Sequence, residues 1–160
     1  MIKVFIEVEA GSCDKNLYDA KTLEYKGTRR ISRPYPYPYG FIMGTRAADG
    51  DNVDCYLITH ERVQPGTIVE CQPIGLLEQD EGGEVDHKVL AVLPGQEVEA
   101  GQALLQELRD FIYDVFAQFP DVVVRVGRVL PREAALQHIQ ACRDLPEAPL
   151  HPPCGPGVSV

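Results

Sequence analysis

The alternation of apolar and polar positions predicts that strands dominate the first hundred residues. Residues alternate in this way from Ile2 to Val8, as they do in a strand with one buried face. Further strands are expected at residues 54–60 and 89–93, each an apolar run bounded by turn residues. A strand at 67–77 is also expected, with a bulge where Pro73 interrupts its ladder.

A different period, in steps of three and four residues, predicts a helix between residues 104 and 119 that packs its broad apolar face on the sheet. A strand is expected next, at 122–129. Pro131 then suits the first turn of a second helix that runs to about Cys142. Its inward side chains are predicted to be Leu136 and Ile139.

Composition indicates one domain, at residues 1–145, because 160 residues of which 44% are hydrophobic can form one proper core. Residues 146–160 are rich in Pro and Gly, and are expected to be an extended or disordered tail. A formal charge of -9 argues against a nucleic-acid partner. With no transmembrane-length apolar run and no signal-peptide layout, we expect no membrane partner and a cytoplasmic location.

The cysteines are five in number and include no Cys-x-x-Cys pair, so reduced thiols are expected at Cys13, Cys55, Cys71, Cys142 and Cys154. The histidines show no ligand spacing and are expected at the surface or at strand ends. His87 is expected to point to the strand face opposite Asp86 and Lys88.

Two acidic clusters carry the candidate chemistry. Asp49, Asp51 and Asp54 fall within six positions after a Gly-rich turn, and such carboxylates repel one another unless a cation lies between them. Alone, this segment is better explained as a solvated acidic turn. A second Gly turn, at residues 79–84, is expected to carry Asp80 and to lead to Asp86, and two such turns can hold several hard divalent cations, of which magnesium is the first choice.

These residues resemble a known family. The run Tyr-x-Tyr-Gly-Phe-Ile-x-Gly-Thr, then Asp49-Gly50-Asp51-x-Val53-Asp54, then Asp80 through Asp86-x-Lys88, is similar to the soluble, magnesium-dependent (family I) inorganic pyrophosphatases. The resemblance implies the pyrophosphatase fold, mainly β with packed helices (α+β), built on a five-stranded OB-like barrel. It also implies a homo-oligomer, since bacterial members are often hexamers.

The resemblance further implies a role for each acid. Asp49, Asp54 and Asp86 would hold one activating magnesium ion, and Asp54 would share a second. Asp80 and Asp86 would hold the metals that arrive with the substrate, with Mn²⁺ or Zn²⁺ as substitutes for Mg²⁺. Asp51 would hydrogen-bond the attacking water and take its proton, because a cation brings the pKa of water toward neutrality and a carboxylate completes the activation. Substrate-binding positions are matched by Lys15, Arg29, Tyr39, Lys88 and the active-site glutamate Glu7.

The expected activity is therefore magnesium-dependent hydrolysis of inorganic pyrophosphate to two phosphates. Two departures bear on it. Leu17 stands where the family has a glutamate, and Phe119-Pro120 stands where it has a phosphate-binding Tyr-Lys pair. The alternatives are a metal-binding protein with little or no turnover and an enzyme for a different phosphoanhydride.

Overall fold

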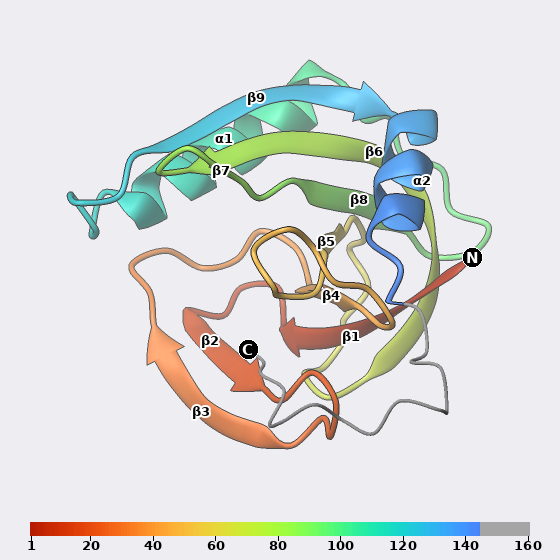
Figure 1. Ribbon diagram of the computed structural model, residues 1–160, viewed down its shortest axis with the longest axis horizontal. Helices are drawn as coiled ribbons and strands as arrows, with labels where there is room; N and C mark the ends of the chain where they lie inside the picture. The colour runs from red at the N-terminus through yellow and green to blue at the C-terminus, as the bar shows by residue number, and fades with distance from the viewer. Residues whose placement is uncertain (145–160) are drawn as a thin grey trace, which may run out of the picture.

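Five strands close into a ring at the centre of the fold (Figure 1). The computed structural model describes residues 1–144. Around the ring the strand order is β1-β4-β5-β8-β6, and β6 pairs back onto β1. The strands of the ring are β1 (Ile2–Val8), β4 (Tyr39–Ile42), β5 (Asp54–Leu57), β8 (Lys88–Val92) and β6 (Ile68–Glu81). The mainly β fold with an OB-like barrel that the sequence predicts is thus confirmed.

The remaining elements extend this ring. A separate hairpin is formed by β2 (Asp14–Tyr18) and β3 (Tyr25–Arg30). The far end of β6 pairs with the short β7 (Glu84–Val85) and with β9 (Val124–Pro131). The helices are α1 (Gln102–Phe116) and α2 (Arg132–Ala141). Both predicted helices and the strand between them are therefore present.

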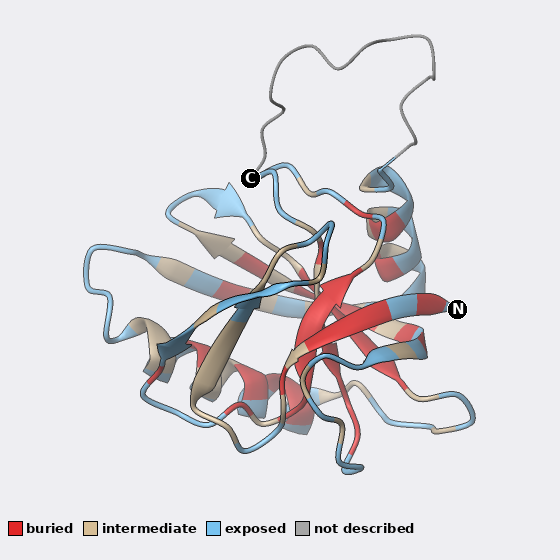
Figure 2. Ribbon diagram, turned by 90° about the horizontal axis from the view of Figure 1, so that it is seen from below, coloured by how far each residue is buried: buried red, intermediate tan, exposed pale blue. Residues whose placement is uncertain are grey.

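Two clusters of buried side chains arise because neighbouring residues of a strand face opposite ways. Cys55 and Leu57 of β5 pack in one cluster with Ala135 and Ile139 of α2. Tyr56, between the two β5 residues, packs in the other cluster with the buried face of α1. Figure 2 shows these buried residues gathered where the strands meet and along one side of α1.

One glycine is required by the close approach of β1 and β4. A Cβ atom built on Gly40 would lie 1.8 Å from the backbone oxygen of Phe5. No side chain fits at that distance, so the pairing of Gly40 opposite Ile6 depends on the missing Cβ.

The structure corrects two predictions. The acidic segment 79–84 is a turn only at Gly82 and Gly83, because β6 continues through Glu81. Leu136 is 43% exposed, since α2 packs through Ala135 and Ile139. The bulge expected near Pro73 is confirmed by a register shift between Pro73 and Gly75.

The four cysteines within residues 1–144 are free thiols, as expected. Cys154 and the predicted tail at 146–160 lie outside the described residues. In the part of the chain that the structure describes, no helix has both the length and the apolar character to cross a membrane.

Candidate active site

A buried lysine lies at the centre of the acidic residues. Lys88 Nζ donates hydrogen bonds to Asp54 Oδ2 at 2.6 Å and to Asp86 Oδ2 at 2.9 Å. It also donates to the phenol oxygen of Tyr39 at 3.3 Å. The arrangement follows from the sheet, because Asp54 and Lys88 are direct partners in the parallel pair β5–β8.

Charge pairing decides the ionisation of Lys88 and Asp86. Burial alone would lower the pKa of Lys88, but Asp54 and Asp86 outweigh burial and raise it above its ordinary value. Burial alone would raise the pKa of Asp86, but Lys88 outweighs it and lowers that pKa. Lys88 is therefore a fixed positive charge, and it is only 5% exposed.

The acidic loop before β5 is held by a buried threonine. The hydroxyl of Thr45 donates to the carbonyl of Ile42 at 2.6 Å and accepts from the backbone N–H of Val53 at 3.0 Å. Within the loop, the N–H of Asp51 donates to Asp49 Oδ1 at 3.0 Å. These bonds give the loop a fixed shape and place its carboxylates beside those of the sheet.

The two loop carboxylates hold protons more tightly than usual. Burial raises the pKa of Asp49, against a hydrogen bond from the Asp51 backbone that lowers it, and Asp86 and Asp54 raise it further. Burial, Asp49 and Asp54 raise the pKa of Asp51. Asp49 and Asp51 thus lie near enough to Asp54, on β5, and to Asp86, just before β8, for their charges to interact.

Glu7, on β1, belongs to the same group of acids. Burial and the charge of Asp54 raise its pKa to about 7, while Lys15 opposes the rise. Lys15 is the direct partner of Arg29 in the β2–β3 hairpin, so both cations stand on one face of that hairpin. The hairpin thus brings two positive side chains toward the acids.

The structure brings Glu81 to the acids where the sequence predicted Asp80. Burial and the charge of Asp86 raise the pKa of Glu81 to about 7. Asp80 is the residue before Glu81 in the same strand and so faces the other way. Its carboxylate accepts only the backbone N–H of Gly83, at 3.4 Å, among the described residues.

A signal for Glu81 was present in the sequence. Side chains two apart in a strand share a face, and Leu77, Gln79 and Glu81 follow the buried positions of β6. Because residues 79–84 were predicted to form a turn, the alternation of side chains along the strand was not extended to Glu81. Tyr56 was also missed, because a tyrosine within an apolar strand carries no pattern that separates a site residue from a core residue.

A cleft of about 340 Å³ adjoins the acids. It has a polar part, which carries the residues expected to contact substrate, and an apolar part formed largely by α1 and the turn that follows it. The polar part is lined by Lys15, Arg29, Tyr39, Tyr56, Glu81 and Lys88. A larger hollow of about 580 Å³ between the end of β1 and residues 59–63 includes none of the predicted site residues.

The acids fit divalent cations. Their donors are all carboxylate oxygens, the ligand type that Mg²⁺ prefers, and neighbouring carboxylates add to burial in raising the pKa of Asp49 and of Asp51. Within residues 1–144 no three acid, histidine or cysteine side chains are already grouped so as to hold a metal ion, and Lys88 lies between Asp54 and Asp86. An open set is suitable, because Mg²⁺ keeps several of its waters.

Comparison with known proteins identifies the family. The family model described as inorganic pyrophosphatase matches residues 4–146. The chain belongs to the inorganic pyrophosphatase family. The inorganic pyrophosphatase of Synechocystis sp. is 33% identical over 153 residues, which is 89% of this chain and 89% of the relative. That of Nostoc sp. is 42% identical over 95 residues, which is 58% of this chain and only 56% of the relative.

Solved structures of the pyrophosphatase family share the fold. Inorganic pyrophosphatase from Thermus thermophilus has a TM-score of 0.80 at 30% identity, over 88% of this chain and 87% of that chain. The Coxiella burnetii inorganic pyrophosphatase has a TM-score of 0.79 at 27% identity, over 88% and 91%. The expected pyrophosphatase fold and hydrolase class are confirmed, and divalent metal ions are the cofactors of this family.

Proposed function

We propose that this chain hydrolyses inorganic pyrophosphate to two phosphates with Mg²⁺ as its cation. The carrying observation is a buried lysine, Lys88, paired with Asp54 and Asp86 beside a cleft lined by two further cations. The charges of Glu7, Asp49, Asp51 and Glu81 interact with those of the paired acids. Carboxylates to hold metal and cations to hold phosphate, side by side, suit phosphoryl transfer to water.

We assign each acid a role from its position. Asp49, Asp54 and Asp86 hold the cations, and Glu81 takes the ligand role that the sequence gave to Asp80. When bound, the cations neutralise phosphate charge and make water more acidic. Asp51, on an exposed loop and not ion-paired to Lys88, accepts the proton of the attacking water. Lys88 lowers the pKa of Asp86 and holds the carboxylates of Asp54 and Asp86 in place.

Phosphate oxygens are bound by Lys15, Arg29 and the phenol of Tyr39. The phosphate-binding lysine that the family resemblance predicts is replaced by Pro120. Each lost charge-assisted contact weakens phosphate binding by about 10- to 100-fold. Leu17 is 38% exposed and adds no charge at a position where the family resemblance predicts a glutamate. We therefore expect a high KM for pyrophosphate and a steep dependence on magnesium.

A phosphate-release assay across a magnesium titration tests the proposal. Pyrophosphate hydrolysis that requires Mg²⁺ and declines when Mg²⁺ is removed supports it, and Mn²⁺ and Zn²⁺ establish the metal preference. Metal binding without phosphate release would favour the alternative of a binding protein with little turnover. The homo-oligomer, hexameric by family resemblance, and the cytoplasmic location stay predictions; light scattering of the purified chain measures the first.

Neighbouring acids on β6 offer a matched pair of variants. Glu81→Gln is expected to weaken magnesium binding by about 10- to 100-fold, because it removes a carboxylate that faces Asp86. Asp80→Asn is expected to change the affinity little, because that side chain faces away. Calorimetric titration of Mg²⁺ into both variants makes the measurement. Equal losses in the two, or a loss only in Asp80→Asn, would return the ligand role to Asp80.

The raised pKa values of two glutamates predict a pH effect in the metal-free protein. Glu7 and Glu81 bind protons more tightly folded than unfolded, since their folded pKa is about 7 and their ordinary value 4.5. The stability that this gives is present below pH 4.5 and is lost as pH rises toward 7. In the presence of a chelator, the double variant Glu7→Gln/Glu81→Gln should have the same melting temperature as the parent at pH 4.5 and a higher melting temperature than the parent at pH 8.

The exposed substitution Glu24→Gln is the control for this comparison, and it should follow the parent at both pH values. Saturating magnesium should reverse the order at pH 8, because the parent then gains about 2.7 kcal/mol at a hundredfold excess over Kd and the double variant gains less. A double variant that melts with the parent at pH 8 in chelator would contradict the prediction.

A further inference from the structure

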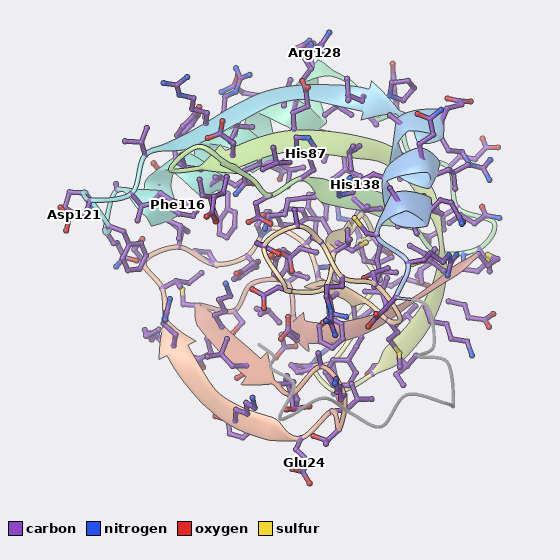
Figure 3. The ribbon with its side chains drawn as sticks, viewed as in Figure 1. Glu24, His87, Phe116, Asp121, Arg128 and His138 are labelled. Atoms are coloured by element: carbon purple, nitrogen blue, oxygen red, sulfur yellow. The ribbon has the colours of Figure 1, made fainter. Side chains whose placement is uncertain are left out.

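One end of the active-site cleft is apolar. Its wall there is formed by α1, by the turn that follows it and by one residue after β3: Ile31, Phe111, Val115, Phe116, Phe119 and Val122. Phe119 is 37% exposed and Val122 is 41% exposed, so the wall meets solvent and is not simply core. Figure 3 places Phe116 at the C-terminal end of α1, and its ring packs edge-on to Phe119 with centroids 6.3 Å apart.

This apolar wall belongs to the same cavity as the phosphate-binding cations. Lys15 and Arg29 lie on the hairpin that faces the C-terminal end of α1, and Lys88 lies deeper. A phosphate chain held by the cations therefore has one end directed at aromatic and aliphatic side chains. Inorganic pyrophosphate has nothing apolar to place against them.

We propose that the cleft also accepts organic diphosphates in which one phosphate is esterified to a small alkyl group, such as a five-carbon branched chain. The alkyl group lies against Phe116, Phe119 and Val122, and the two phosphates occupy the polar part. This inference rests on the proposed function, whose acids and cations it uses, and adds a substrate class to it.

The chemistry of the wall favours an alkyl group over a nucleoside. A base and a ribose carry donors and acceptors that need hydrogen-bonding partners when buried. Among the described residues the six wall side chains offer none. The cleft also contains Tyr35, whose single phenol lies on a ring that packs against Phe111 with centroids 4.8 Å apart, and Gln79, which is 3% exposed. Its amide nitrogen donates to Glu81 at 3.3 Å, and its Oε1 lacks a partner among residues 1–144.

The reaction that follows is balanced. The oxygen of water attacks the terminal phosphorus, the bridging P–O bond breaks, and the bridging oxygen stays with the alkyl phosphate. Asp51 takes one proton from the water. The products are orthophosphate and an alkyl monophosphate, and the carbon–oxygen bond remains intact.

Hydrolysis-resistant analogues test binding apart from turnover. Methyl and isopentyl monoesters of methylenebisphosphonate carry equal charge and differ only in apolar surface. The ratio of their Kd values in the presence of magnesium therefore measures how much the apolar wall contributes to binding. Each buried methylene strengthens binding about fourfold, and we expect the isopentyl ester to bind at least about tenfold more tightly. Calorimetry on the full chain measures both.

Two neighbouring valines give the matched variants. Val122→Ser should reduce the isopentyl preference to below about threefold. Val123→Ser, at a residue that is 61% exposed and outside the cleft, should leave it unchanged. Phosphate release from pyrophosphate, measured on the same samples, reports the proposed function separately.

Equal affinity of the two esters, or a preference that both variants lose alike, overturns the inference, even where pyrophosphate is hydrolysed. An isopentyl preference that only Val122→Ser removes supports it, even if pyrophosphate hydrolysis fails and the proposed function has to be revised. Release of orthophosphate from isopentyl diphosphate by the parent would extend the support from binding to reaction.

Discussion

Asp51→Asn is expected to lower the rate of pyrophosphate hydrolysis by about 10²- to 10⁴-fold, the range of general-base catalysis, with little change in magnesium affinity. The amide keeps the size of the carboxylate but cannot accept a proton from water. The backbone N–H of Asp51, which orders the loop through Asp49, is unaffected by the change. Steady-state kinetics and magnesium titration of the same sample separate the two effects.

Asp110→Asn is the control for this variant, because Asp110 is exposed on α1 and outside the cleft. It should hydrolyse pyrophosphate like the parent. If Asp51→Asn also did so, Asp51 would not be the base. If it lost magnesium binding together with activity, Asp51 would be a metal ligand.

Lys88→Met is expected to destabilise the metal-free protein by about 3–5 kcal/mol, because it leaves two partly buried carboxylates without their cation. Those carboxylates, of Asp54 and Asp86, have side chains that are only 24% and 16% exposed. Added magnesium should recover part of the loss, since a bound cation supplies charge at the same place. Denaturant unfolding with and without magnesium measures both effects.

Lys26→Met removes an ion pair with Asp19 whose lysine side chain is 61% exposed. Such surface pairs contribute about 0–1 kcal/mol, so this variant should unfold close to the parent. A Lys88→Met protein as stable as Lys26→Met without magnesium would show that the central ion pair is not what keeps the acids together.

The parts of the fold that depend on local pattern were predictable from the sequence. The alternation from Ile2 to Val8 gave the first strand, and the spacing between residues 104 and 119 gave the long helix, because burial on one face imposes the period of the backbone. Ring closure was not visible in the same way. The pairing of β1 with β6 joins residues far apart in sequence, and here the family resemblance, not the periodicity, indicated the barrel.

In the candidate site, too, only the features that depend on residues close in sequence were predictable. Asp49, Asp51 and Asp54 are close in sequence, and a turn was enough to place them together. The partnership of Asp54 with Lys88 required the parallel pairing of β5 with β8, which no local pattern records. Whether Asp80 or Glu81 faces the site depends on the alternation of side chains along β6. The sequence did not show that β6 continues as far as Glu81.

Closure of the ring sets an order of events during synthesis. β1 leaves the ribosome first, but one of its two partners, β6, begins only at Ile68. The parallel neighbour of β5 begins later still, at Lys88. β1 therefore keeps an open hydrogen-bonding edge until β6 emerges, and β5 and β6 keep theirs until β8 emerges. Such edges are prone to pair with other chains. Because its lysine arrives with β8, the strand that fills the last gap in the ring also brings the charge that holds Asp54.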